Sequence, residues 1–230
     1  MNLIDFDNKI GYRKMNLIKD YLKTALNSFA AGICIGIGGT VYLMCPSKPL
    51  GAFMFAVGLC TILIFGLNLY TGMVGYLFDN KPLYLVKLGI VWLGNFAGTA
   101  TVGALMRLTR AGKSISEIAE NVVASKLSDG FLSLFILGIF CGILMFVGVD
   151  SFKKQWAQKD FAAIFMPVIC VAVFIVAGFE HCIADMFYFV AAGKGAEGLL
   201  VLLAVTLGNS VGGVLIPVIK KLTGKLDAAK

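Results

Sequence analysis

Three ionisable side chains lie close together inside one of the long apolar stretches of the chain. Glu180, His181 and Asp185 fall within residues 161–190, and His181 is the only histidine in the sequence. An ionisable group at membrane depth costs roughly 2.5–3.5 kcal/mol on insertion scales, so such groups are usually functional or paired. Gly178, just before them, can loosen the helix. The stretch predicts a helix that is broken at the membrane midplane to present a polar site, as in transporters.

The composition is that of an integral membrane protein. Of 230 residues, 59% are hydrophobic and only 14% are charged, whereas charged residues make up about a quarter of a soluble domain. We therefore expect an all-α helix bundle in lipid. The net charge of +7 reflects orientation in the bilayer rather than a nucleic-acid partner, and the chain carries no DNA- or RNA-binding motif.

The cysteines do not indicate a metal site or disulfides. None forms a C-x-x-C pair, and small apolar packing residues are the expected role. A metal site made of His181, Cys182 and Asp185 is an alternative, but three ligands so close together on one helix splay around its circumference. We expect no metal and no cofactor. The six cysteines are Cys34, Cys45, Cys60, Cys141, Cys170 and Cys182.

Hydropathy predicts one transmembrane domain, residues 1–230, with six spans at about 24–44, 50–78, 88–106, 131–149, 161–190 and 198–219. An amphipathic cytoplasmic segment at the membrane surface (1–23) precedes a first repeat (24–110). An outer loop with a short helix (111–130), a second repeat (131–219) and a cytoplasmic tail (220–230) follow. With both termini inside, fourteen basic residues are cytoplasmic and six are outside, which agrees with the positive-inside rule.

The two halves of the chain share a pattern. Residues 93–98 read L-G-N-F-A-G and residues 207–212 read L-G-N-S-V-G, while the second and fifth spans break at 66–69 and 178–181. Because each half has three spans, the halves must be inverted in the membrane, and paired broken helices indicate a midplane transport site. The alternative is chance similarity between two glycine-rich helices, which the matching breaks disfavour.

Four motifs carry a resemblance to a known family. They are Asn68-Leu69-Tyr70-Thr71-Gly72, Trp92-Leu93-Gly94-Asn95, Phe179-Glu180-His181 through Met186-Phe187, and Leu207-Gly208-Asn209-Ser210-Val211-Gly212-Gly213. Over nearly its whole length the chain resembles the formate/nitrite transporter family. The resemblance implies an aquaporin-like protomer of six transmembrane helices with an inverted repeat and broken helices 2 and 5. It also implies a homopentamer in which each protomer holds its own pore.

The resemblance also implies roles for individual residues. His181 and Thr71 would lie at the pore centre, with Asn209 and Glu180 nearby and Lys126 as the pore-side lysine. The apolar constrictions would be Phe55, Leu59 and Phe174, and Leu69 and Tyr70 would narrow the cytoplasmic side.

The chemistry of these residue types agrees with those roles. Thr71, Asn209 and His181 can donate hydrogen bonds to an anion, Lys126 can attract one, and a dry apolar neck excludes hydrated ions. Without the resemblance, each would have an ordinary role: a threonine that bonds backbone, packing phenylalanines and a solvated lysine.

Three positions depart from the family pattern. Members that carry formate or nitrite usually have an acidic residue where Asn68 stands, and asparagines where Gly142 and Asp185 stand. The departures resemble the branch associated with hydrosulfide. The sequence thus predicts a channel in the cell (inner) membrane for small anions of weak acids, with hydrosulfide as the first candidate and formate or nitrite as the alternative.

Two other classes of protein fit less well. An aquaporin-type channel for neutral solutes has two Asn-Pro-Ala boxes, and this sequence has neither. A membrane enzyme or redox protein would need a pair of helical histidines or a cysteine cluster, and a single histidine cannot ligate haem on both faces. The expected partners are small inorganic or organic anions, membrane lipids and further copies of the chain.

Overall fold

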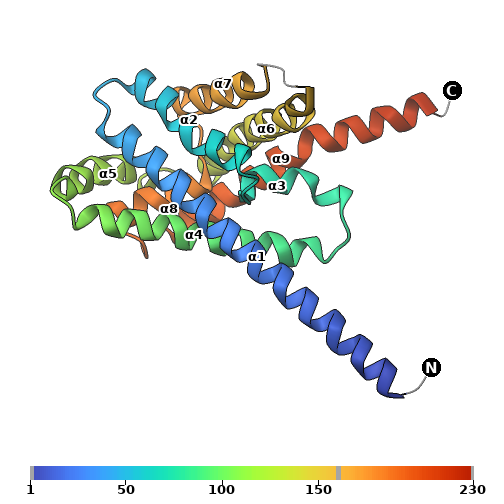
Figure 1. The fold of residues 1–230 in the computed structure, drawn as a ribbon. Helices are drawn as coiled ribbons and strands as arrows, with labels where there is room; N and C mark the ends of the chain where they lie inside the picture. Colours follow the sequence, from blue (N-terminus) through green and yellow to red (C-terminus); the bar gives the residue numbers. More distant parts are fainter. Residues whose placement is uncertain (1–2, 159–161, 229–230) are drawn as a thin grey trace.

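The computed structural model describes residues 3–158 and 162–228, with the side chains of 15–156, 158 and 163–224 (Figure 1). The predicted start of the fifth span at Phe161 and the basic residue Lys159 lie outside the described residues. The described chain is helical throughout, without a strand, which confirms the all-α prediction. Its elements are α1 (Leu3–Met44), α2 (Lys48–Ile64), α3 (Tyr70–Met73), η1 (Val74–Asp79), α4 (Tyr84–Arg107), α5 (Gly112–Leu127), α6 (Phe131–Gln155), η2 (Trp156–Gln158), α7 (Ala162–Ala177), α8 (Cys182–Ala191) and α9 (Leu199–Ala228).

The apolar helices lie in the six stretches that hydropathy predicts as spans. Four helices, α1, α4, α6 and α9, are long and apolar enough to cross a membrane, and α7 and α8 together form a fifth segment bent by 58°. The remaining apolar helix, α2, has only 17 residues and continues through a break into α3 and η1. Breaks therefore interrupt the second and fifth segments, as predicted from the sequence.

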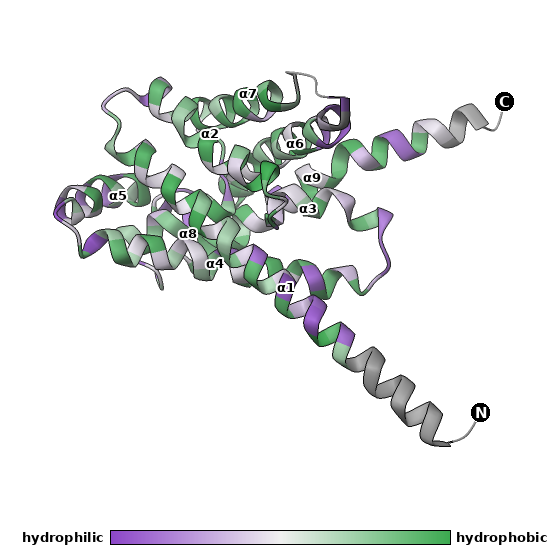
Figure 2. Ribbon diagram, in the orientation of Figure 1, coloured by the Kyte–Doolittle hydropathy of each residue, from purple (hydrophilic) through white to green (hydrophobic). Residues whose placement is uncertain are grey.

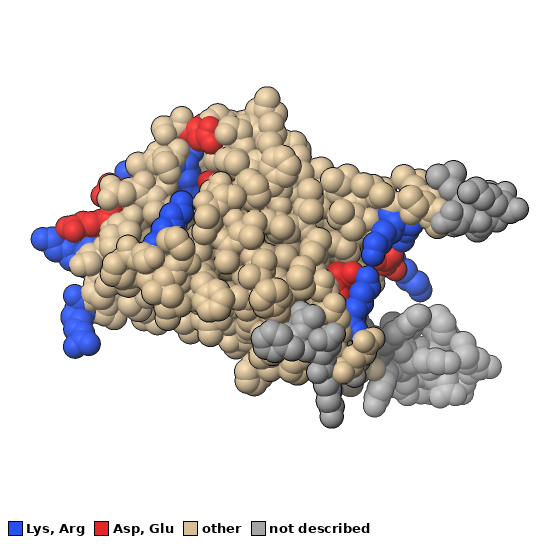
Figure 3. Space-filling model, turned by 90° about the horizontal axis from the view of Figure 1, so that it is seen from above, with Lys and Arg blue, Asp and Glu red and all other residues tan. Residues whose placement is uncertain are grey.

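Polar residues lie at two ends of the bundle. In Figure 2 the body of the bundle is mostly apolar, and hydrophilic positions gather at α5, at the η1–α4 connection and towards both termini. On the face drawn in Figure 3, charged side chains likewise gather at the two ends and leave a broad uncharged band between them. Such a band is what the hydrocarbon core of a bilayer requires.

Both breaks are made in the same way. Gly66 and Gly178 have φ values of 63° and 75°, in the left-handed region that only glycine adopts without strain. In each case the next residue caps the helix: the Leu67 N–H donates to Ile62 O at 2.9 Å and the Phe179 N–H donates to Phe174 O at 2.9 Å. This bond from the residue after the glycine back across the last turn is a Schellman C-cap.

Two buried asparagines hold the unwound segments. Asn95 donates to the carbonyls of Ser28 and Asn68 at 2.8 Å each and accepts from the Tyr70 N–H at 2.9 Å. Asn209 donates to the carbonyls of Gly138 and Glu180 at 2.8 Å each and accepts from the Cys182 N–H at 2.9 Å. Each asparagine thus satisfies backbone groups that a broken helix leaves without partners, and the two halves repeat the arrangement.

The helix pairs that carry these asparagines pack equally closely. A Cβ added to Gly32 of α1 would meet the carbonyl oxygen of Asn95, and one added to Gly142 of α6 would meet that of Asn209. Gly142 is therefore a contact position between α6 and α9, as small residues are between membrane helices. Gly142 lines neither the pocket beside Leu69 nor the pocket beside His181, and its missing side chain makes room for helix α9.

Three boundaries differ from the prediction. Residues 3–23 continue the first span as part of the single helix α1, rather than forming a separate surface helix. The outer loop 111–130 is mostly the 16-residue helix α5, and the predicted tail continues α9 as far as Ala228. Hydropathy misses the extensions of α1 and α9 because a helix can continue out of the hydrocarbon core of the bilayer without a change in its backbone conformation. Figure 1 shows both termini projecting from the end of the bundle opposite α5.

We expect Asn209→Ala to destabilise the protein severely. It leaves Glu180 O and the Cys182 N–H at the break without partners and removes a second bond from Gly138 O, and each unsatisfied buried group costs about 1–3 kcal/mol. Thermal unfolding in detergent measures the loss. Asn95→Ala should behave alike, whereas Asn80→Ala, which removes one exposed side-chain bond, should leave the melting temperature unchanged. Equal melting temperatures for Asn209→Ala and Asn80→Ala would contradict this account.

Candidate functional site

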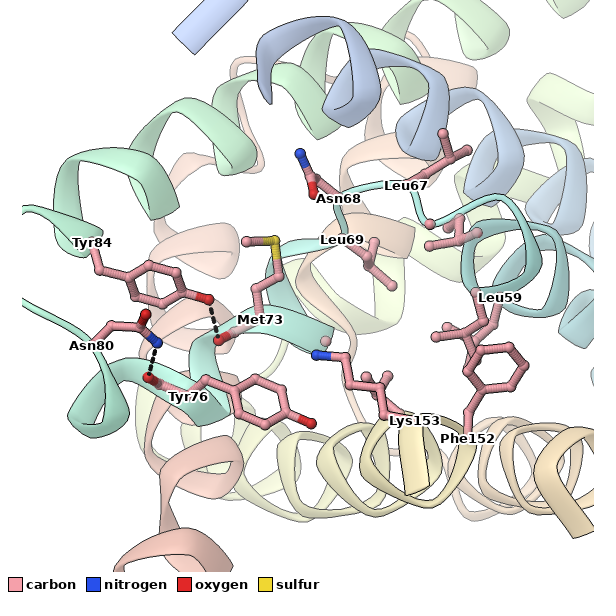
Figure 4. Close-up of a pocket in the computed structure, with 15 residues that line it drawn as sticks. Leu59, Leu67, Asn68, Leu69, Met73, Tyr76, Asn80, Tyr84, Phe152 and Lys153 are labelled. Atoms are coloured by element: carbon pink, nitrogen blue, oxygen red, sulfur yellow. Dashed lines mark hydrogen bonds between the residues drawn. The ribbon is translucent and has the colours of Figure 1, made fainter. Parts of the chain in front are cut away.

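Two pockets enter the bundle from opposite ends. The terminus-side pocket, about 460 Å³, lies at the end where α3, η1 and the last turns of α6 meet, and Leu59, Asn68 and Leu69 line its deep part. Figure 4 shows this pocket. The α5-side pocket, about 250 Å³, lies beneath α5, and Phe174, Glu180 and His181 line it. Both pockets reach the unwound segments between the helices, which face each other across the bundle.

A hydrogen bond at the centre joins helix α3 to the unwound segment that precedes α8. The Thr71 hydroxyl lies 2.9 Å from His181 Nε2. His181 is also the N-cap of α8, where its Nδ1 accepts the Ala184 N–H at 3.1 Å. Because Nδ1 accepts, the ring proton of the neutral imidazole is on Nε2 and is donated to Thr71. The proton of the Thr71 hydroxyl is then left to donate to a third group.

Apolar side chains surround this bond. The Phe174 ring stacks on the His181 ring with 5.5 Å between centroids, and Phe55 meets Phe174 edge-on at 6.3 Å. Leu59 and Phe55 are each only 1% exposed. The structure thus links Phe55, Phe174, His181 and Thr71 through successive contacts. Phe55, Leu59 and Phe174 belong to one buried apolar cluster, which lies between the two pockets.

Lys126 extends from α5 into the α5-side pocket and contacts two carboxylates. Its Nζ forms ion pairs with Glu180 Oε2 and, at 3.0 Å, with Asp185 Oδ1. The side chains of Lys126 and Glu180 are each 10% exposed, and that of Asp185 is 1% exposed. Asp185 Oδ2 is buried without a hydrogen-bond partner among the described residues. Lys126 is thus a buried, paired charge and not a solvated loop residue.

The charges of this pocket balance. Its charged lining residues are Lys48, Lys126, Glu180 and Asp185, so their formal charges sum to zero. Two carboxylates thus pair with the positive charge of Lys126, and the attraction of anions by this lysine stays a prediction. The sequence contained both carboxylates, but only the packing of α5 against the unwound segment brings Lys126 to them.

Two other predicted residues have structural partners instead of facing a pocket. Asn209 uses both amide protons on backbone carbonyls, so it has no donor left for an anion. The Tyr70 hydroxyl bonds Ser210 Oγ at 2.8 Å and tethers α3 to α9, and Tyr70 does not line the terminus-side pocket, whereas Leu69 does. The repeated L-G-N motif singled out Asn95 and Asn209 in the sequence. Their structural role, however, depends on backbone groups that are distant from them in the sequence.

Comparison with known proteins agrees with this geometry. The family model described as formate/nitrite transporter matches residues 7–221. The chain belongs to the formate/nitrite transporter family. It is 28% identical over 215 residues to the nitrite transporter NirC of Escherichia coli, covering 82% of this chain and 78% of NirC. It is 25% identical over 187 residues to the formate channel FocA of Haemophilus influenzae, covering 70% of this chain and 63% of FocA.

Solved structures of the formate/nitrite transporter family share the fold. A pentameric formate channel with formate bound superimposes with a TM-score of 0.74 at 25% identity, covering 90% of this chain and 98% of that one. An ion channel of the same family superimposes with a TM-score of 0.71 at 25% identity, covering 89% of each chain. The chain is thus a multi-pass membrane protein with a channel fold and not an enzyme.

We expect Lys126→Ala to destabilise the fold, because it leaves Glu180 and Asp185 buried without a counter-charge. Removing one partner of a buried ion pair costs about 3–5 kcal/mol. The control is Lys113→Ala on the same helix, which removes a lysine that is 90% exposed and 4.0 Å from Glu117. Melting in detergent should fall strongly for the first variant only. A triple variant that also carries Glu180→Gln and Asp185→Asn should recover stability; if it does not, the charge imbalance is not the cause.

Proposed function

We propose that this protein is a channel for small monovalent anions of weak acids, with hydrosulfide as its first candidate substrate. The observation that carries the proposal is the dry segment between the two pockets, in which Phe55, Leu59 and Phe174 surround the Thr71–His181 bond. An ion without a counter-charge cannot cross such a segment cheaply. The anion of a weak acid can cross it after taking up a proton, because the acid itself is neutral.

Polar partners at the centre of the segment fit a solute of this size. In the proposed passage, the free proton of Thr71 donates a hydrogen bond to the solute, while His181 Nε2 holds the Thr71 oxygen in place. Leu69 bounds the segment at the terminus-side pocket and Phe174 bounds it at the α5-side pocket. This assignment gives Leu59, Leu69, Phe55 and Phe174 the role of constrictions, and Glu180 and Lys126 the role of the α5-side mouth.

The charge balance of the α5-side pocket favours hydrosulfide. A mouth with two lysines and two carboxylates does not raise the local concentration of anions as a net positive mouth does. Formic acid is almost fully ionised at neutral pH and depends on such attraction. Hydrogen sulfide is a much weaker acid, so a large share of it is already neutral and needs no attraction.

Formate or nitrite is the second candidate. A formate channel and a nitrite transporter are among the relatives of this chain, and the solved formate channel has formate bound and is pentameric. We extend the pentamer to this protein, with one pore in each protomer. The proposed orientation puts both termini, which project from the same end of the bundle (Figure 1), in the cytoplasm, because fourteen of twenty basic residues then lie on that side as the positive-inside rule requires.

Flux into proteoliposomes tests the function directly. Stopped-flow uptake of hydrosulfide, formate and nitrite by vesicles with the wild-type protein should exceed uptake by protein-free vesicles. The uptake rate divided by the anion concentration should be highest for hydrosulfide.

Asp185→Asn leaves Lys126 with one carboxylate and makes the α5-side pocket net positive. Dilute formate should therefore enter several-fold faster at low salt, and added salt should shrink the gain. Glu117→Gln, which removes an exposed charge of the same helix α5 that holds Lys126, is the control and should change nothing. Wild-type flux no higher than that of empty vesicles would overturn the proposal.

His181→Asn separates hydrogen bonding from helix capping. Asparagine is a good N-cap, so α8 stays capped while the Nε2–H donor to Thr71 is lost. Because a neutral hydrogen bond contributes about 0.5–1.5 kcal/mol, flux should fall by about two- to tenfold. If His181 acts only as a fixed donor, the loss should be the same at every pH. If it relays a proton, the pH profile should flatten instead, and flux measured across a pH series distinguishes the two.

A further inference from the structure

The terminus-side pocket contains one cation and no carboxylate. Among its fifteen lining residues, Lys153 is the only charged one. The other polar groups around it are largely engaged: the Tyr84 hydroxyl donates to Met73 O at 3.1 Å, and the Asn80 amide donates to Tyr76 O at 2.8 Å. Figure 4 shows these two bonds at the rim and the Lys153 amine pointing into the cavity between them and Leu69. The pocket therefore has a net positive charge, unlike the α5-side pocket.

An aromatic ring holds this lysine in place. Lys153 Nζ lies 3.8 Å from the centroid of the Tyr76 ring, a close cation–π contact. The ring itself is anchored, because the Tyr76 hydroxyl donates to Asp150 Oδ1 at 3.2 Å. A cation–π contact leaves the N–H groups of the ammonium on its far side free to donate, since the ring occupies only one face.

The nearest carboxylate is already engaged elsewhere. Asp150 accepts from Tyr76 through one oxygen and from Lys154 through the other, at 2.5 Å. Within the described part of the chain, no carboxylate forms an ion pair with Lys153, whereas Lys126 of the α5-side pocket pairs with two. Lys153 is an exposed residue at the pocket wall. Asp150 acts on its charge only from beyond ion-pair distance, so the ammonium keeps donor capacity for an anion.

We propose that Lys153, supported by Tyr76, forms a binding site for a small monovalent anion in the terminus-side pocket. The site holds the permeant anion beside Leu69, next to the dry segment, and thereby raises its concentration at this mouth. The amide of Asn68, which donates over 3.4 Å to Thr24 O, lines the same pocket and its second N–H adds a donor. The proposal rests on the proposed channel function and adds an asymmetry to it: the charged mouth is the one on the side of the termini.

Flux from the two sides tests the site. Formate is the probe, because it remains an anion at neutral pH. Vesicles of each orientation, distinguished by protease access to the C-terminal tail, give the half-saturation concentration from each side. Lys153→Gln should raise it about threefold or more on the terminus side, most strongly at low salt, and leave it unchanged on the α5 side. Lys153→Arg should restore the wild-type value on the terminus side.

Matched variants separate the site from a general loss of charge. Lys81→Gln removes a positive charge at the same end of the bundle, from a residue that does not line the pocket, and should leave formate half-saturation unchanged. Tyr76→Phe keeps the ring beneath the ammonium but frees Asp150 Oδ1, so it should weaken formate binding less than Tyr76→Leu, which also removes the ring and should weaken binding as Lys153→Gln does.

The outcomes are distinguishable. Wild-type flux with equal half-saturation for wild type and Lys153→Gln on both sides would overturn the Lys153 site and leave the channel intact. The Lys153 site would also be overturned if Lys153→Gln raised the half-saturation concentration equally on both sides and Lys153→Arg did not restore it. Lys153 would then have a structural role. Absence of any anion flux in the wild type would instead overturn the proposed function itself.

Discussion

The structure depends on one constraint, which is that backbone groups inside a bilayer have no water with which to form hydrogen bonds. Breaking a helix at membrane depth exposes several N–H and C=O groups, and each must find a partner within the protein. Asn95 and Asn209 supply those partners, one for each break, with three hydrogen bonds apiece. Without them the unwound segments that carry Leu69, Thr71, Glu180 and His181 would have no defined position. The two asparagines are therefore the condition for a polar site between the helices.

The inverted repeat gives the two breaks the same backbone but different chemistry. At equivalent positions before α3 and α8, the first half has Leu69 and the second has His181. One break thus contributes an apolar side chain, and the other contributes a helix cap with a second ring nitrogen free to bond Thr71. A symmetric scaffold in this way positions an asymmetric pair of groups at the centre.

The two ends of the bundle differ in whether the pocket lysine is paired with carboxylates. Beneath α5, Lys126 is compensated by Glu180 and Asp185, which removes the positive potential that a single lysine would create. At the other end Lys153 faces a pocket without carboxylates, because Asp150 is occupied by Tyr76 and Lys154. The proposed preference for a weaker acid and the proposed anion site both follow from these pairings, and neither follows from the number of charges alone.

The sequence by itself determined the membrane class, the all-α fold, the repeated motif and the two breaks. Hydropathy, glycine and the repeated L-G-N motif are local signals, and a bilayer admits few backbone solutions for them. It also identified Thr71, His181 and Phe174 as neighbours through the family resemblance. Only the tertiary structure decided that Asn209 and Tyr70 bond protein groups, that Gly142 packs against α9, that Lys126 is compensated and that Lys153 is not. These outcomes depend on which donors and acceptors from distant segments meet, and short-range hydrogen bonds and ion pairs form only where the packing of whole helices brings their atoms within reach.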